Sequence, residues 1–181
     1  MGIGWEGEKV RLVPLDFDRP FDNCYRWIND PEVNEWLAIG DFPMSRLAEK
    51  EWFEARQKST CPELAMAIET LDGVHIGNTG VHRIDFRSGT ATTGSLIGDA
   101  AERGKGYGTD AAKVRAWYCF HVLGLRMLYS EYLAGNDLSK RMQEKSGYKQ
   151  YGVKPQAIWK RGQYRDMVLT YLSREDWEAS L

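Results

Sequence analysis

Residues 103–110 read Arg-Gly-Lys-Gly-Tyr-Gly-Thr-Asp, and this stretch decides both the fold and the expected chemistry. Its three glycines stand at alternate positions, between a strand-like run at 92–99 and a helical pattern at 111–122. A glycine-rich loop that opens onto a helix exposes backbone N–H groups, and the helix dipole adds positive potential there. Arg103 and Lys105 add two positive charges. The stretch therefore predicts a pyrophosphate-binding loop.

The spacing of these glycines differs from two familiar phosphate-binding motifs. A P-loop needs Gly, four residues and then Gly-Lys-Ser/Thr, and no such run occurs in the chain. A dinucleotide fingerprint needs Gly-x-Gly-x-x-Gly, whereas here the third glycine, Gly108, comes one residue early. The remaining pattern is Arg-x-x-Gly-x-Gly between a strand and a helix. Taken alone, it fits a flexible connector as well as a phosphate site.

Length and composition predict one soluble domain over residues 1–181. The chain has 181 residues, of which 43% are hydrophobic and 28% charged, enough for one core and too few for two ordinary domains. The formal net charge of -2 argues against a general nucleic-acid binder. We therefore expect no direct binding of nucleic acid.

Cysteine and histidine spacing predicts neither a disulfide framework nor a metal site. The cysteines are far apart and odd in number, and the histidines lack ligand spacing: Cys24, Cys61, Cys119, His75, His82 and His121. The start of the chain shows no signal-peptide pattern, and no apolar run approaches the length of a membrane span. We expect a cytoplasmic protein with no metal and no membrane partner.

Hydrophobic periodicity and turn residues divide the chain into strands and helices. Strands are predicted at residues 9–15, 63–70, 74–86, 92–99, 127–133, 148–159 and 164–172, and helices at residues 18–29, 32–38, 45–58, 111–122 and 136–147. The strand–helix–strand unit from 92 to 133 should form a parallel crossover. The last two strands should pair as a hairpin.

Three further runs carry the motifs of one family. Residues 26–33 read Arg-Trp-Ile-Asn-Asp-Pro-Glu-Val, and residues 156–166 end in Gly-Gln-Tyr-Arg-Asp. Asn136 and Ser139 form an Asn-x-x-Ser run, which Glu-Lys-Ser-Gly-Tyr follows at 144–148. Together with the glycine loop, these runs resemble the GNAT N-acetyltransferases in order and spacing, and within them the RimJ/RimL-like subgroup.

The resemblance implies a mixed α/β (α+β) GNAT fold: a mostly antiparallel seven-stranded sheet with about four helices, split into a V between its fourth and fifth strands. It also implies acetyl-CoA as co-substrate and an amine acceptor as partner, and it leaves a homodimer open. The residues that match the acetyl-CoA site are Leu96, Ile97, Gly98, Arg103, Gly104, Lys105, Gly106, Tyr107, Gly108, Thr109, Asn136 and Lys140. Lys140 and Arg141 fit a solvated helix face equally well. Ser139 matches a serine implicated in catalysis in RimL-like enzymes.

The catalytic positions depart from the family's pattern. Where many relatives carry a glutamate base before the loop, this chain has Thr92 and Thr93. Where many carry a tyrosine acid seven residues after the asparagine, it has Gln143. A backbone N–H near Ile97 is the expected oxyanion donor. The missing acid and base leave open a non-catalytic acyl-CoA-binding sensor.

The acceptor is expected to be an α-amine at a protein or peptide N-terminus. Such an amine has a pKa of about 7.7–8.0, so deprotonation at pH 7 costs about 1 kcal/mol, against about 4–5 kcal/mol for a lysine-like ammonium. A chain without an obvious base therefore suits the α-amine. A polyamine or an aminoglycoside remains an alternative acceptor. Tyr151, Gly152 and Pro155 replace the subgroup's usual hairpin residues, so the acceptor need not be a ribosomal protein.

Overall fold

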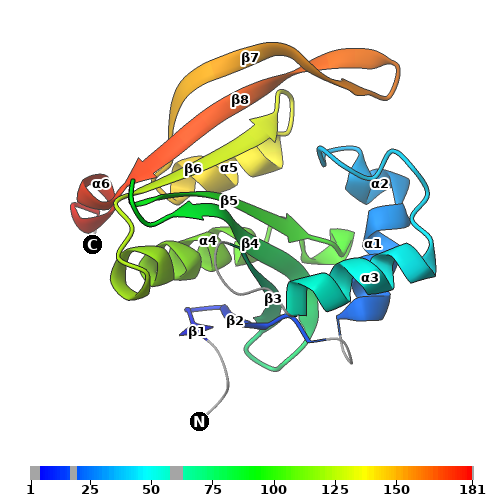
Figure 1. The fold of residues 1–181 in the computed structure, drawn as a ribbon, viewed down its shortest axis with the longest axis horizontal. Helices are drawn as coiled ribbons and strands as arrows, with labels where there is room; N and C mark the ends of the chain where they lie inside the picture. The colour runs from blue at the N-terminus through cyan, green and yellow to red at the C-terminus, as the bar shows by residue number, and fades with distance from the viewer. Residues whose placement is uncertain (1–4, 17–19, 58–62, 181) are drawn as a thin grey trace.

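The computed structural model describes residues 5–16, 20–57 and 63–180, which form one eight-stranded sheet (Figure 1). The strand order is β1-β2-β3-β4-β5-β6-β8-β7, and every neighbouring pair is antiparallel except β5–β6, which is parallel. The strands are β1 (Trp5–Glu6), β2 (Val10–Pro14), β3 (Leu64–Thr70), β4 (His75–Asp85), β5 (Thr90–Ile97), β6 (Met127–Leu133), β7 (Lys149–Lys160) and β8 (Gln163–Ser173). The predicted parallel crossover and terminal hairpin are confirmed.

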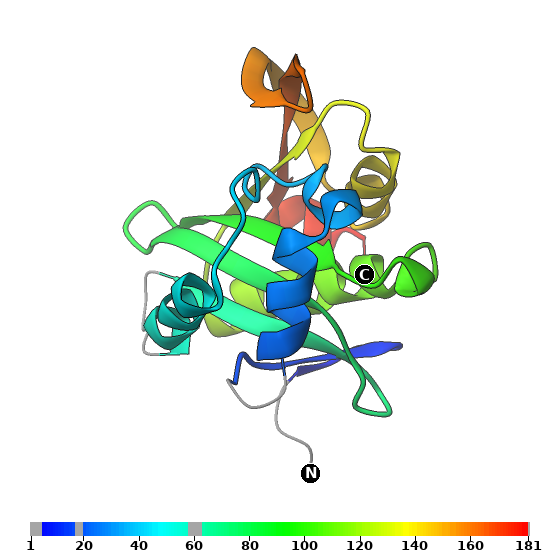
Figure 2. The same ribbon diagram turned by 90° about the vertical axis from the view of Figure 1, so that its right-hand side faces the viewer.

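Helices cover both faces of the sheet (Figure 2). One face carries α1 (Phe21–Asn29), α2 (Pro31–Asn34) and α3 (Arg46–Gln57), and the other carries α4 (Tyr107–Trp117) and α5 (Asp137–Lys145). The short helix η1 (Ala100–Glu102) precedes α4, the π-helical turn η2 (Tyr118–Val122) continues it, and α6 (Arg174–Glu178) follows β8. In the described parts of the chain, no helix is long and apolar enough to span a membrane.

Two apolar clusters hold these layers together. Beneath α4, sheet residues such as Leu12, Ile68 and Ile76 pack against Val114. Beneath α1 and α3, Trp27 and Phe53 pack against Ala67 and their neighbours. Ile68 and its chain neighbour Ala67 thus face opposite helix layers, as the alternation of side chains along a strand requires. Each fully buried large apolar side chain contributes about 1.5–3 kcal/mol, so β3 is anchored on both faces.

The sheet has eight strands rather than the seven predicted, and the described residues form six α-helices rather than about four. The additional strand, β1, is only two residues long, too short for a periodic signal; its Trp5 ring packs 5.8 Å from Trp117 and 5.2 Å from Tyr118. The unpredicted α6 begins at a side-chain cap, because Ser173 Oγ accepts the Asp176 N–H at 3.0 Å.

Two helix boundaries also differ from prediction. The helix expected from residue 111 begins at Tyr107, because Gly106 takes a left-handed conformation (φ +90°) and serves as its N-cap. The helix expected over 32–38 ends at Asn34, whose side chain donates to the Ile28 carbonyl at 3.1 Å and accepts from Arg161 at 2.7 Å. These tertiary bonds fix the chain where periodicity alone would continue the helix. The predicted helix start at 18 and end at 58 lie outside the described residues.

Candidate active site

Strands β5 and β6 pair over three residues and then separate, which leaves a split in the sheet. Their parallel register joins residues 90–92 to residues 127–129. Two hydroxyls make the next connections: Thr93 Oγ1 donates to the Tyr129 carbonyl at 3.1 Å, and Ser130 Oγ donates to the Thr93 carbonyl at 3.0 Å. Beyond this apex, and within the described residues, the β5 backbone has a strand partner only in β4.

The free edge of β5 presents backbone groups to this split. The Gly98 N–H donates to the Ile76 carbonyl at 3.0 Å, so Gly98 faces β4. Because backbone groups alternate in direction along a strand, those of Ile97 and Ser95 face the split instead. An extended, amide-containing ligand can pair with such an edge like an added strand. The predicted oxyanion donor near Ile97 therefore lies on the split edge.

The glycine loop joins the end of β5 to the start of α4. Gly104 (φ +77°) and Gly106 (φ +90°) both take left-handed conformations that favour glycine. The first intrahelical bond runs from the Asp110 N–H to the Gly106 carbonyl at 3.0 Å, so the N–H groups of residues 107–109 have no partner within the helix. Backbone donors at a helix N-terminus are suited to bind an anion, which is the basis of the predicted pyrophosphate site.

Lys9 also lies at this loop, although no motif in the sequence predicts it there. Its Nζ donates to the Lys105 carbonyl at 3.0 Å, and a Cβ added to Gly106 would lie 3.1 Å from the same Nζ. The Asp110 carboxylate holds this segment by accepting the N–H groups of Glu8, Lys9 and Val10 at 3.3, 2.8 and 3.0 Å. The turn before β2 thereby supplies an ammonium group to the loop from about a hundred residues away.

Arg103, which is predicted to add positive charge to the loop, hydrogen-bonds the end of β5. Its Nε donates to the Ile97 carbonyl at 3.1 Å, and its Nη2 donates to the Gly98 carbonyl at 2.9 Å. Lys105 Nζ in turn pairs with Glu102 at 3.0 Å. The Arg103 guanidinium therefore fixes the end of β5, and Lys9 supplies a further cation beside the glycines.

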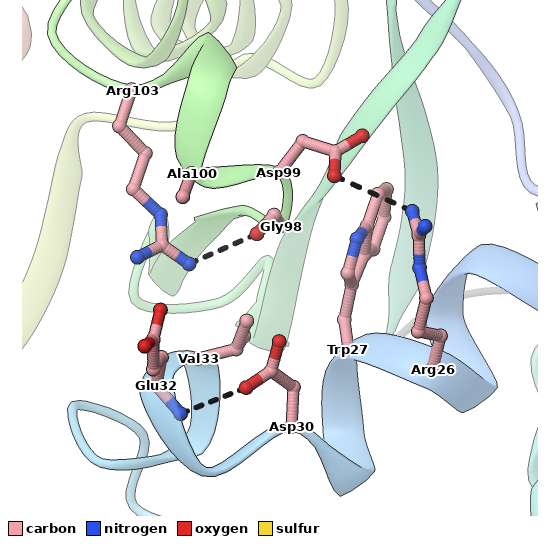
Figure 3. A pocket seen from close by; sticks show the side chains of 9 residues that line it. All are labelled: Arg26, Trp27, Asp30, Glu32, Val33, Gly98, Asp99, Ala100 and Arg103. Carbon is pink, nitrogen blue, oxygen red and sulfur yellow. Dashed lines mark hydrogen bonds and ion pairs between the residues drawn. The ribbon is translucent and has the colours of Figure 1, made fainter.

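Arg103 also lines a cavity of about 150 Å³ between α1, α2 and the end of β5 (Figure 3). The Trp27 ring forms one wall, and a Cβ at Gly98 would lie 1.9 Å from it, so only glycine fits there. The cavity is close to charge balance, with two guanidinium groups and three carboxylates: Arg26, Arg103, Asp30, Glu32 and Asp99. Its walls join the family-like run at 26–33 to the glycine loop.

The predicted residues of α5 lie close to the loop. Asn136 caps this helix, because its Oδ1 accepts the Ser139 N–H at 3.1 Å. A Cβ at Gly108 would lie 3.6 Å from both Met142 of α5 and Ile97 of β5, so the three elements meet at this glycine. Ser139 is half-buried, and its hydroxyl makes no hydrogen bond to a described residue. Lys140 is exposed.

Two of the three positions considered for an acid and a base, Thr93 and Gln143, are occupied by buried structural groups. Thr93 is 3% exposed, and its hydroxyl bonds the Tyr129 carbonyl and, at 2.8 Å, the Tyr148 hydroxyl. Gln143 is also 3% exposed; its Nε2 donates to Ser130 Oγ at 3.2 Å, and its Oε1 accepts from Thr170. Both side chains brace the apex of the split. Sequence position identified them, but burial removes them from the chemistry.

A buried arginine lies beneath the same apex. Arg115 is 1% exposed, and its Nη1 donates to Thr79 Oγ1 and Ser95 Oγ, both at 2.6 Å, and to the Gly94 carbonyl at 2.8 Å. Its Nη2 donates to the Tyr148 hydroxyl at 3.4 Å. No ion pair joins it to a carboxylate of the described residues. The apex therefore has a fixed positive charge beneath it.

This combination of a split sheet, a glycine loop and a free strand edge belongs to a known family. The family model for the acetyltransferase (GNAT) domain matches residues 9–149, and the chain belongs to this family of N-acetyltransferases. The family assignment favours an enzyme over the non-catalytic sensor that the sequence left open.

The most similar proteins include a curated relative and two solved structures. The chain is 26% identical over 174 residues to YdaF of Bacillus subtilis (strain 168), described as a putative ribosomal N-acetyltransferase, with 94% of this chain and 93% of the relative covered. Spermidine N-acetyltransferase from Vibrio cholerae, solved with CoA and spermine, has a TM-score of 0.84 at 17% identity and covers 93% of this chain and 98% of its own. Mycobacterium smegmatis RimJ, solved with CoA-disulfide, has a TM-score of 0.82 at 16% identity, and the match covers 92% of this chain and 83% of RimJ. The two solved structures are similar in fold alone.

Proposed function

We propose that the chain transfers the acetyl group of acetyl-CoA to the α-amine of a protein or peptide N-terminus, as a RimJ/RimL-like enzyme. In this proposal the pyrophosphate lies on the N–H groups of residues 107–109, with the Lys9 ammonium beside it. The amide-rich arm of acetyl-CoA then extends along the β5 edge, and a backbone N–H of this edge near Ile97 receives the oxyanion of the reacting thioester. The solved relatives with CoA or CoA-disulfide support this choice of co-substrate.

The acceptor side is bounded by α2, the chain after it, and the β7–β8 hairpin. Trp36, two residues after α2, packs under Arg165 of β8, with the guanidinium carbon 4.8 Å from the ring centre. The same ring lies 3.7 Å from the position of a Cβ on Gly135, which follows β6. The segment after α2 therefore reaches across the split to its far side. An acceptor enters beneath this bridge.

The choice of an α-amine as the acceptor rests on the ion pairs at the acceptor side of the molecule. A polyamine or an aminoglycoside has several ammonium groups and needs several free carboxylates. Here three carboxylates are each paired with a cation of the hairpin, at 3.4, 2.8 and 3.4 Å: Glu131 with Lys154, Asp41 with Lys160, and Glu35 with Arg165. These pairs neutralise three carboxylates that could otherwise attract a polycation. A peptide N-terminus, with a single ammonium group, suits the site better.

Release of CoA from acetyl-CoA, measured against a panel of amines, tests this proposal. The panel holds peptides with free N-termini, the same peptides with blocked N-termini, spermidine and an aminoglycoside. We expect turnover with the free peptides alone, with the acetyl group located on the N-terminal nitrogen by mass spectrometry. Turnover confined to spermidine or the aminoglycoside would refute the acceptor, and no turnover with any amine would refute the activity.

A further inference from the structure

We infer that His82 is the general base that takes a proton from the acceptor ammonium, an inference that rests on the proposed acetyl transfer. His82 lies on β4, opposite Thr92 of β5 in the register of the sheet. Thr92 is the last β5 residue that pairs with β6, through Tyr129. The His82 side chain therefore stands one strand away from the apex of the split.

His82 projects from the face of the sheet that α1, α2 and α3 cover, which is the side of the proposed acceptor site. Asn78, on the same strand, donates to Cys24 of α1 at 2.9 Å, so residues 78, 80 and 82 face the α1 layer. Thr79, between them, bonds Arg115 of α4 at 2.6 Å and faces the other layer. The glycine loop begins α4, so a phosphate there and the imidazole lie on different sides of the sheet. A thioester held in the split between β5 and β6 is accessible from both sides of the sheet.

Two glycines make space around the ring. Gly80 of β4 and Gly94 of β5 lie directly opposite each other. A Cβ on Gly80 would lie 2.4 Å from His82 Nε2, so the imidazole lies over that glycine, whereas a Cβ on Gly94 would meet nothing within 4 Å. The register shifts after His82, and Arg83 has φ 49°, which marks a β-bulge of the kind that redirects side chains near active sites.

The three histidines differ in how they are held. His75 has both ring nitrogens bonded, to Asn23 at 3.2 Å and to Asn78 at 3.0 Å. His121 is exposed and packs between two tryptophan rings beside α6. His82 is half-buried and makes no hydrogen bond to a described residue. Its nitrogens are therefore available to a substrate.

The surroundings of His82 keep its imidazole neutral. Burial lowers its pKa, and the positive charges of Arg56 on α3, Arg115 on α4 and Arg83 on β4 lower it further. Glu63, which immediately precedes β3, is ion-paired with Arg56. A pKa below the ordinary value of 6.5 leaves the ring neutral at pH 7, and a neutral ring can accept a proton.

The reaction then balances with the groups present. One ring nitrogen of His82 takes a proton from the acceptor ammonium, and the freed lone pair forms a C–N bond with the thioester carbonyl carbon. The carbonyl oxygen becomes an oxyanion beside the Ser95 N–H, which faces the split next to Gly94 and the His82 ring. The C–S bond breaks, and the sulfur leaves with its electron pair and takes the second amine proton. The products are an amide, the CoA thiol and one proton, which the imidazolium returns to water.

Two matched variants test the inference, His82→Gln at the site and His121→Gln as the control. We expect His82→Gln to lower kcat with peptide acceptors by about 100-fold while leaving the affinity for acetyl-CoA unchanged. In the wild type, kcat at saturating substrates should fall as the pH drops through the pKa of His82, which lies below 6.5, and His82→Gln should lose this acidic limb. A His82→Gln variant with the kcat and pH profile of His121→Gln would overturn the inference and leave the proposed function intact.

NMR of CoA binding to the wild type tests whether His82 lies beside the CoA site, and it needs no turnover. The imidazole NMR signal that disappears in His82→Gln should shift when CoA is added, whereas the signal missing from His121→Gln should stay in place. A His82 signal unmoved by CoA would overturn the inference even if His82→Gln were too unstable to assay. Absence of acetyl transfer by the wild type to any amine would instead refute the proposed function.

Discussion

Replacing Gly106 with aspartate should abolish acetyl-CoA binding, because the new carboxylate would lie at the N-terminus of α4. A Cβ at this position is 3.1 Å from Lys9 Nζ, so the carboxylate would pair with the ammonium that we assign to the pyrophosphate. It would also repel the pyrophosphate directly. Two like charges about 5 Å apart repel by about 3 kcal/mol at an effective dielectric of about 20, equivalent to roughly 100-fold in affinity.

The matched control is Gly106→Asn, which has the same shape and no charge. Both side chains tolerate the left-handed conformation (φ +90°) better than most, and both carry its strain of about 1–2 kcal/mol. The difference between the two variants therefore isolates the charge. Isothermal titration calorimetry with CoA at low and high salt measures the affinity of each variant. The difference in affinity between the two variants should become smaller as the salt concentration rises. Equal affinities for the aspartate and asparagine variants would refute the assignment of the loop.

Two further substitutions test the supports of the site. Asp110→Asn should lower the free energy of unfolding by about 2–3 kcal/mol in urea denaturation, because three N–H groups lose a charged acceptor. The same change should weaken CoA binding, because it releases Lys9 from the loop. An unchanged CoA affinity would contradict the role of Lys9. Thr93→Val should cost about 1–3 kcal/mol in the same assay, because the buried Tyr148 hydroxyl loses the closer of its two partners and the Tyr129 carbonyl loses a donor, whereas Thr92→Val should stay within about 0.5 kcal/mol. Equal losses for the two threonine variants would count against the apex network.

The parts of the fold that the sequence predicted are those governed by local rules. Alternating glycines before a helix, the parallel crossover around it and the hairpin at 148–172 all depend on residues close together in the chain. The resemblance carried by the family-like runs added one non-local feature, the split between β5 and β6. The sequence could not give the strand β1, because two residues carry no period and their packing on Trp117 is a tertiary contact.

The candidate site was less predictable, because its chemistry depends on distant contacts and on burial. Lys9 reaches the loop only because Asp110 binds the turn around it, across a separation of 101 residues. The place of His82 depends on the register between β4 and β5 and on the glycine beneath its ring. Conversely, Gln143 stands where many relatives carry a tyrosine acid, and only the structure shows that its side chain braces the interior.

The electrostatics of the two faces explain why a neutral base suits this enzyme better than a carboxylate. The α4 N-terminus and Lys9 favour the anionic part of the co-substrate, and Arg115 places a buried positive charge beneath the apex where an oxyanion develops. Burial and the charges of Arg56, Arg115 and Arg83 lower the pKa of His82, and the same positive charges disfavour a protonated acceptor. An amine that loses its proton at little cost gains most from positive potential at the reacting centre, whereas that potential opposes an amine with several permanent charges. Under the proposed function, the charge that stabilises the oxyanion would therefore also favour an α-amine.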